Sequence, residues 1–153
     1  MSDRTDPGGC ALAFDVGSRW LGVAIGNALS HSARPLGTID RQAENTEQRV
    51  RALLAEWRPT ALVVGDPLDI DGGEQEATRI ARRFARQLRH WSGLPVALMD
   101  ERFSSREADA RHTHGRRQGT ARRKHAAHQD AGAAQVILER WLDAGMPYPE
   151  PTP

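Results

Sequence analysis

Short apolar runs separated by turn residues predict five β-strands. The first two runs are joined by Gly17 and Ser18, and two apolar runs joined by a tight turn indicate a β-hairpin. In the third run Pro35 stands at the start, where a strand tolerates a missing N–H. The predicted strands cover residues 11–16, 20–25, 35–40, 61–65 and 94–99.

Between and after these strands, apolar residues recur at helical spacing. Pro59 and Gly93 follow the first two periodic segments, as expected of residues that end a helix. Ser104 or Ser105 can cap a third helix, with Glu107 placed to complete a capping box. The predicted helices cover residues 45–57, 74–91, 104–112 and 125–144, with a loop over 113–124.

The order of these elements predicts an α/β fold in which an antiparallel hairpin leads into parallel strands joined by helices. At 153 residues the chain is long enough for one domain with a sizeable core. We expect that domain to cover residues 10–145, between a disordered tail (1–9) and a proline-rich tail (146–153). No apolar run approaches the roughly 20 residues that span a bilayer, so no membrane partner is expected.

The composition is typical of a globular protein, with 39% hydrophobic and 27% charged residues. The single cysteine, Cys10, excludes an internal disulfide and fits a reducing compartment, so we expect a cytoplasmic protein. Because Cys10 opens an apolar strand, we interpret it as a small buried hydrophobic residue.

The net charge is only +1, but the basic residues are unevenly distributed. No acidic residue lies between Asp109 and Asp130, a stretch that also holds four of the six histidines. Such a block is typical of an arm that binds polyanions, although a solvated loop without a ligand has the same composition. Its cationic residues are Arg111, Arg116, Arg117, Arg122, Arg123 and Lys124.

Three acidic residues are placed as members of a site rather than as surface charges. Asp15 lies inside the first apolar run, where a carboxylate is costly unless it is paired, hydrogen-bonded or bound to a cation. Glu101 comes just beyond the end of the 94–99 strand, the position at which open α/β sheets present ligand-binding groups. Asp130 lies in the last predicted helix beside small residues, which allow that helix to approach the sheet closely.

If Asp15, Glu101 and Asp130 converge, their oxygens form a pocket suited to Mg²⁺ or Mn²⁺. Two such ions about 4 Å apart activate water and stabilise the leaving oxygen of a phosphodiester. Each residue also has a structural alternative. Asp15 can form a turn, Glu101 can pair with Arg102 or Arg106, and Asp130 can simply favour a helix start.

Other candidate ligands are weaker. Asp100 adjoins Glu101, but neighbouring side chains on a strand point to opposite faces. Asp66, Asp69 and Asp71 lack the glutamate that a calcium loop needs at its twelfth position, so they are interpreted as turn residues. The histidines of the basic stretch have no cysteine near them, and we expect them to be solvated or to face phosphate rather than to bind zinc.

Four segments together resemble the YqgF family, also called RuvX, a group of Holliday-junction-resolvase-like proteins with a ribonuclease H-like fold. They occur in the family's order and at similar spacing over about residues 10–144, and read FDVGSRWLGVAIGN, ALVVGDPLDIDGGE, LPVALMDERFSSREA and HQDAGAAQVILERWL. The resemblance implies a five-stranded mixed sheet of strand order 3-2-1-4-5 with helices on both faces.

The same resemblance implies a nuclease that matures the 5′ end of pre-16S ribosomal RNA in the bacterial cytoplasm. It places the catalytic, metal-binding carboxylates at Asp15, Glu101 and Asp130, with Mg²⁺ or Mn²⁺ as the cofactor. It also implies that Arg102 contacts phosphate or orients Glu101. The substrate-binding residues expected with Arg102 are Arg116, Arg117, Arg122, Arg123 and Lys124.

The chain departs from the family pattern at two places. The family's Gly-hydrophobe-Pro turn here contains Asp66 between Gly65 and Pro67, which adds an acid near the strand end. The lysine- and glycine-rich stretch that precedes the last aspartate has become RRKHAAHQD, a change that concerns substrate handling rather than the three carboxylates.

Several functions remain open at this point. A structured RNA such as pre-16S rRNA, branched DNA and ribosomal particles are all candidate partners, and we expect a monomer or a weak homodimer. A DNA junction resolvase would use the same carboxylates but must act as a dimer, because two strands are cut symmetrically. A non-catalytic RNA-binding assembly factor would need only the basic stretch. The Asp-x-Gly motif at Asp15 also occurs in actin-like ATPases, which need two such domains.

Overall fold

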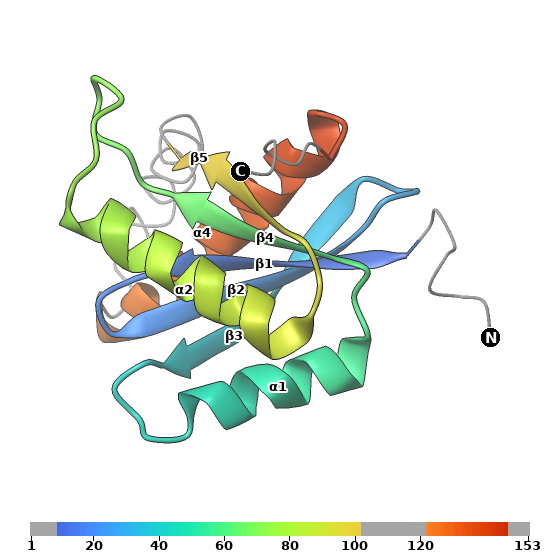
Figure 1. The fold of residues 1–153 in the computed structure, drawn as a ribbon, viewed down its shortest axis with the longest axis horizontal. Helices are drawn as coiled ribbons and strands as arrows, with labels where there is room; N and C mark the ends of the chain where they lie inside the picture. Colours follow the sequence, from blue (N-terminus) through green and yellow to red (C-terminus); the bar gives the residue numbers. More distant parts are fainter. Residues whose placement is uncertain (1–8, 102–121, 147–153) are drawn as a thin grey trace.

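The computed structural model describes residues 9–101 and 122–146, and within 122–130 it describes the backbone only (Figure 1). The expected tails, the predicted helix over 104–112 and most of the basic stretch lie outside these residues. The strands are β1 (Cys10–Val16), β2 (Trp20–Asn27), β3 (Ser32–Asp40), β4 (Ala61–Asp66) and β5 (Val96–Asp100). The helices are α1 (Thr46–Trp57), α2 (Glu76–Ser92) and α4 (Arg122–Asp143).

The strands form one mixed sheet in the order β3-β2-β1-β4-β5. The pairs β1–β2 and β2–β3 are antiparallel, whereas β1–β4 and β4–β5 are parallel. This arrangement confirms the expected fold, including the strand order 3-2-1-4-5. The parallel strands β1, β4 and β5 all end at the same edge of the sheet, which is therefore the edge where ligand-binding groups are expected.

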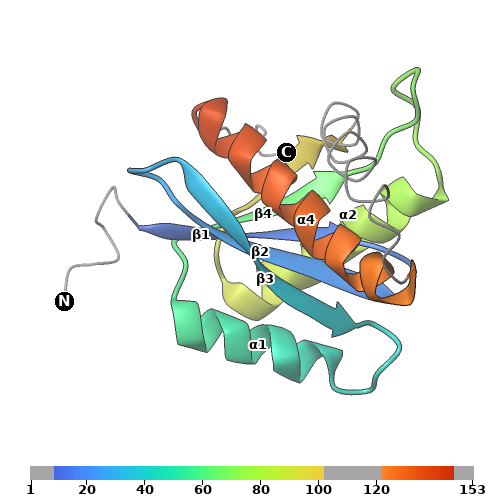
Figure 2. The ribbon, with the colours of Figure 1, turned by 180° about the vertical axis from the view of Figure 1, so that it is seen from behind.

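Helices cover both faces of the sheet, as predicted: α1 and α2 lie on one face and α4 lies on the other (Figures 1 and 2). Side chains alternate along β1, so Leu12 and Phe14 pack into the core beneath α1 and α2. Ala11 and Ala13 join the second core, beneath α4. These small residues let α4 approach the sheet closely.

The direction of α4 follows from the contacts along it. Near its C-terminal end Asp143 lies 3.5 Å from His31, which belongs to the β2–β3 turn, opposite the edge where β1 ends. The N-terminal half of α4, which contains Asp130, therefore extends toward the edge where β1, β4 and β5 end, as the orange end of the helix shows in Figure 2.

Two details differ from the sequence prediction. β3 begins at Ser32, so Pro35 lies inside the strand rather than at its start. A proline is tolerated there because β3 is an edge strand and its pairing with β2 is interrupted by a bulge beside Val23. The predicted loop also ends too late, since α4 already begins at Arg122. Arginine, lysine and alanine after that point are strong helix formers.

The predicted ends of the first two helices are confirmed. α1 is followed by Arg58 in the left-handed conformation (φ 46°), directly before Pro59. α2 ends at Gly93, whose φ of 69° suits a residue without a Cβ. Among the helices in the described part of the chain, none combines the length and the apolar character needed to cross a membrane.

Candidate active site

Two of the predicted site residues meet at the edge where the parallel strands end. Asp15 is the penultimate residue of β1, and Glu101 directly follows β5. Phe14 pairs with Val64 of β4, and Gly65 pairs with Met99 of β5, so Asp15 lies level with Gly65 and Met99, and Glu101 follows Met99 by two residues at the same edge. The side chains of Asp15 and Glu101 are hydrogen-bonded to each other.

The alternation of side chains along β1 places Asp15 on the face covered by α4. Ala11 and Ala13, which precede it at two-residue spacing, pack in the core beneath that helix. Directly opposite Asp15 in the sheet is Gly22 of β2, which has no side chain to fill the space beside the carboxylate. Asp15 is therefore an interior-facing acid and not a turn residue, so the turn alternative is wrong.

Burial raises the pKa of both acids, and the charge of Asp15 adds to this effect at Glu101. Loss of solvent raises the pKa of Asp15 and is the largest influence on it. The hydrogen bond from Glu101 lowers the same pKa by a smaller amount. The pKa of Glu101 is raised to about 9 by burial first, then by the negative charge of Asp15 and by the hydrogen bond between them. Two carboxyl groups held this closely keep one proton between them unless a cation is present.

A glycine makes room for the Glu101 carboxylate. A Cβ on Gly65 of β4 would lie 2.7 Å from both Cδ and Oε2 of Glu101, and 2.6 Å from Cδ1 of Ile137 in α4. Real Cβ atoms are not found at such distances, so any larger residue at this position would displace one or both neighbours. The absence of a side chain at Gly65 thus lets the carboxylate and α4 lie directly over the strand.

Asp66, the acid that departs from the family pattern, lies on the face of the sheet that α2 covers. Asp66 is buried and accepts two hydrogen bonds of 2.9 Å from Arg82 of α2, one from Nε and one from Nη2. Arg82 also lies 3.0 Å from Glu74, so it joins both ends of the segment between β4 and α2. Asp66 is therefore part of a buried ion pair rather than a turn residue.

The turn interpretation holds for Asp69. Its Oδ1 accepts hydrogen bonds from the backbone N–H groups of Asp71 and Gly73. The ion pair at Asp66 was missed because a turn-rich sequence follows it directly. The signal that identifies it is alternation: Val63 and Gly65 face α4, so Asp66 must face α2, where the predicted helix presents arginines.

The third predicted ligand lies in a segment described by its backbone only. Asp130 precedes Ala134 of α4 by one helical turn, and Ala134 is fully buried in the core beneath the helix. Among the side chains described, those of residues 9–101 and 131–146, there is no group of three histidine, cysteine, aspartate or glutamate residues placed to hold a metal ion.

The expected substrate-binding residues fall in or next to the undescribed segment. Arg102, Arg116 and Arg117 lie outside the described residues. Arg122 and Arg123, together with Lys124, form the first turn of α4, the part of the helix that extends toward the edge holding Asp15. Their role in binding substrate stays a prediction.

Two arginines beside Asp15 were not singled out from the sequence. Arg41, which follows β3, donates from Nη1 to the carbonyl oxygens of Gly17 at 2.6 Å and Ser18 at 3.4 Å. Arg19 stacks over the ring of Trp20 at 4.9 Å. The antiparallel pairing of Trp20 with Asp40 brings these distant segments together, and no sequence pattern marks it.

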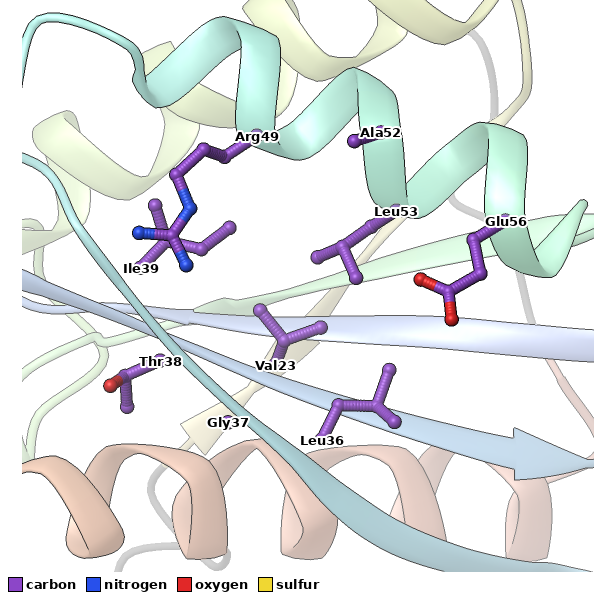
Figure 3. A pocket seen from close by; sticks show the side chains of 9 residues that line it. All are labelled: Val23, Leu36, Gly37, Thr38, Ile39, Arg49, Ala52, Leu53 and Glu56. Atoms are coloured by element: carbon purple, nitrogen blue, oxygen red, sulfur yellow. The ribbon is translucent and has the colours of Figure 1, made fainter.

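A separate cavity of about 260 Å³ lies on the opposite face of the sheet, between α1 and β3 (Figure 3). Val23, Leu36 and Leu53 line its centre, and Arg49 and Glu56 of α1 lie toward its two ends. Glu56 is its only acidic lining residue, and Asp15 and Glu101 are on the other side of the sheet. This cavity is therefore not the site indicated by the carboxylates.

The fold is ribonuclease H-like. Two solved structures of Thermus thermophilus RuvC share the fold, one of them in complex with a Holliday junction substrate. That complex aligns with a TM-score of 0.54 at 17% identity, covering 90% of this chain and 95% of that chain. The other aligns with a TM-score of 0.50 at 18% identity, covering 90% and 96%.

The family is defined by sequence. The model of the RuvX family, described as Holliday junction resolvase, matches residues 9–144, and the chain belongs to this family. A relative from Xanthomonas oryzae pv. oryzae (strain PXO99A), named "Putative pre-16S rRNA nuclease", is 49% identical over 139 residues, 90% of each chain. A relative of the same name from Xanthomonas axonopodis pv. citri (strain 306) is 48% identical with the same coverage.

Proposed function

We propose that this protein is a divalent-metal-dependent endonuclease that processes the 5′ end of pre-16S ribosomal RNA. The observation that carries the proposal is the hydrogen-bonded pair of partly buried carboxyl groups, Asp15 and Glu101, at the edge where the parallel strands end. A partly buried acid pair of this kind is costly to a fold and is characteristic of a functional site. The substrate class comes from the names of the relatives described above.

The donor set fits Mg²⁺ or Mn²⁺. Asp15 and Glu101 supply carboxylate oxygens, the ligands these hard cations prefer, and Gly65 leaves space beside the Glu101 carboxylate. We assign Asp130 as the third ligand, because α4 brings its backbone toward the same edge. A metal held by these residues would lower the pKa of a coordinated water and would stabilise negative charge on a phosphodiester.

The chain's own residues position the reaction. β1 is a central strand, so Asp15 is held on a rigid element, and Gly65 and Ile137 limit where the Glu101 carboxylate can lie. The basic residues of α4 and of the preceding segment, with Arg102, bind substrate phosphates and set the strand over the carboxylates. These basic residues are Arg116, Arg117, Arg122, Arg123 and Lys124.

The test uses purified full-length protein, a precursor 16S rRNA fragment that carries the 5′ extension, and a four-way DNA junction. Each substrate is incubated with Mg²⁺, with Mn²⁺ or with EDTA. We expect cleavage of the RNA with either metal and none with EDTA, and loss of at least about 100-fold in rate for Asp15→Asn and for Glu101→Gln. Glu47→Gln, an exposed acid paired with Arg51 on α1, is the matched control and keeps the wild-type rate.

Three outcomes count against the proposal in different ways. Preferential cleavage of the junction, with a dimer in sedimentation, would identify a DNA resolvase, the activity in the family's description. Full activity of both carboxylate variants would place the chemistry elsewhere. No cleavage of either substrate with any metal, combined with RNA binding that is lost when the basic residues of α4 are neutralised, would identify a non-catalytic assembly factor.

A further inference from the structure

Two arginines flank the β1–β2 turn, which follows Asp15 directly. We infer that Arg19 and Arg41 form a subsite for the backbone phosphates of the nucleic-acid strand that passes the Asp15–Glu101 pair. The inference rests on the proposed nuclease function and adds a second set of phosphate contacts, on the β2–β3 side of the sheet, to those expected from α4 and the segment before it.

Arg41 is a partly buried cation whose recorded partners are carbonyl groups. Its Nη1 donates to the oxygens of Gly17 and Ser18, and its backbone N–H donates to the oxygen of Arg19. Within the described part of the chain no carboxylate ion pair is formed by Arg41. Partial burial lowers the pKa of its guanidinium. An anion within reach would form charge-assisted hydrogen bonds with this group.

Arg19 carries its charge in an exposed, oriented position. Its guanidinium lies 4.9 Å from the centre of the Trp20 ring, and stacking on an aromatic face holds it in one plane. The pair that its Nη2 forms with Asp40 is long, at 3.4 Å, and the arginine side chain is 54% exposed. A surface pair of this geometry is weak, so the Arg19 charge remains available to a phosphate.

The alternation of β2 places this stack on the same face of the sheet as Asp15. Trp20 shares its side of β2 with Ala24, which packs beneath α4, as do Ala11 and Ala13 on the side of β1 that carries Asp15. Asp15 lies opposite Gly22, so Trp20, two residues further along β2, occupies a diagonal position roughly 7–8 Å from Asp15. A strand whose phosphate sits at the carboxylates therefore brings a neighbouring phosphate to Arg19 and Arg41.

The net charge of the turn favours this occupant. Arg19 and Arg41 outweigh Asp40, and the two acids at the site are neutralised when metal is bound. A guanidinium fork matches the oxygens of a phosphate and gives charge-assisted hydrogen bonds. Such contacts bind the backbone without regard to sequence and fix the register of the strand.

A matched control lies on β3, near the end of the β2–β3 pair that is remote from Asp15. Arg34 of β3 stacks on Trp57 at 5.5 Å, a second arginine–tryptophan pair. It pairs with Ile25, toward the end of β2 that is remote from Asp15. Replacing Arg34 removes the same charge and the same kind of stacking contact without touching the edge that holds the carboxylates.

The experiment measures affinity for a fluorescent RNA hairpin with a single-stranded 5′ extension, by anisotropy in EDTA between 50 and 300 mM KCl, so that cleavage plays no part. Arg19→Ala and Arg41→Lys are compared with Arg34→Ala, after thermal melts have checked that each is folded. We expect Arg19→Ala to weaken binding about 3- to 10-fold and to lower the log–log salt slope by about one unit. Arg41→Lys keeps the charge but not the fork, so its binding weakens while its slope changes little.

Arg34→Ala should match the wild type in both affinity and slope. The inference is overturned if Arg19→Ala and Arg34→Ala behave alike, or if wild-type protein does not bind the hairpin at 50 mM KCl. These results are independent of the catalytic test. A protein that binds with the expected slopes but cuts nothing in Mg²⁺ would contradict the proposed nuclease function and leave the phosphate subsite standing.

Discussion

Gly65 and Glu101 are complementary in shape: a Cβ on Gly65 would lie 2.7 Å from both Cδ and Oε2 of the Glu101 side chain. The two residues come from different strands, β4 and the end of β5, and meet because those strands are parallel neighbours. The absence of a side chain at Gly65 therefore leaves the space that the Glu101 carboxylate occupies. It determines where the Glu101 carboxylate can lie relative to Asp15.

Gly65→Ala tests this relationship. The new methyl group would meet the Glu101 carboxylate and Cδ1 of Ile137. Both groups are the ends of flexible side chains, so the fold should survive while the carboxylate moves. We expect near-native circular dichroism and a loss of roughly 10- to 100-fold in Mn²⁺ affinity or nuclease rate, as when the support of a metal ligand is removed. Isothermal titration with Mn²⁺ and cleavage assays measure the two effects.

The matched control is Gly132→Ala in α4, where nothing lies within 4 Å of the added Cβ. Alanine inside a helix is favoured over glycine by about 0.5–1 kcal/mol, so this variant should be slightly more stable and keep its metal affinity. Wild-type metal affinity in Gly65→Ala would mean that the Glu101 carboxylate takes no part in the metal site.

The acid pair also predicts how stability depends on pH in the absence of metal. Because the pKa of Glu101 is about 9 in the folded protein and near 4.5 when unfolded, the folded state holds an extra proton between those values. Stability is then full below about pH 4.5 and falls as the pH rises toward 9. Thermal melts in EDTA at pH 5 and pH 8.5 should show this loss. The melting temperature should fall by about 3 °C for each kcal/mol of unfolding free energy that is lost.

Glu101→Gln removes the cause of that dependence. In EDTA the variant should melt several degrees above the wild type at pH 8.5, and the difference should shrink at pH 5. Added Mg²⁺ should raise the melting temperature of the wild type and leave the variant nearly unchanged, since ligand binding stabilises only a protein that binds it. Parallel curves for both proteins at every pH would contradict the shared-proton arrangement.

Much of the architecture could be predicted from local sequence. Strand alternation, the helical periodicity of 45–57 and 74–91, and Gly93 locate the elements, while the family motifs supply the strand order. The positions of Asp15 and Glu101 relative to the strands could also be predicted. Asp15 lies inside an apolar run and Glu101 directly follows one, and both features can be read from a few neighbouring residues. Their hydrogen bond was not visible, since it depends on the parallel pairing through β4.

What sequence could not supply were contacts set by pairing and packing across the sheet. Arg41 reaches Gly17 only because β3 returns antiparallel to β2. Asp66 and Arg82 meet because α2 packs over β4, and a turn-rich sequence concealed that ion pair. The start of α4 at Arg122 was not predicted, because the clustered positive charge of that stretch indicates a loop although its arginine, lysine and alanine residues favour a helix.

The Asp66–Arg82 pair yields a prediction about the departure from the family pattern. Asp66 is only 9% exposed and Arg82 is 32% exposed, so removing the arginine leaves a buried carboxylate without its main partner. We expect Arg82→Met to lower the free energy of unfolding by about 2–3 kcal/mol, measured in urea. Asp66→Leu should cost much less, because the arginine keeps Glu74 and partial access to water.

The double variant Asp66→Leu/Arg82→Met decides what the pair contributes. It restores a hydrophobic residue at the position where the family has one, and replacing a buried pair by apolar groups of similar size is often neutral or stabilising. We therefore expect the double variant to recover most of the stability lost in Arg82→Met, giving a coupling energy of roughly 2 kcal/mol. Additive losses would instead mean that each side chain acts through other contacts, and that the ion pair is not what holds the end of β4 to α2.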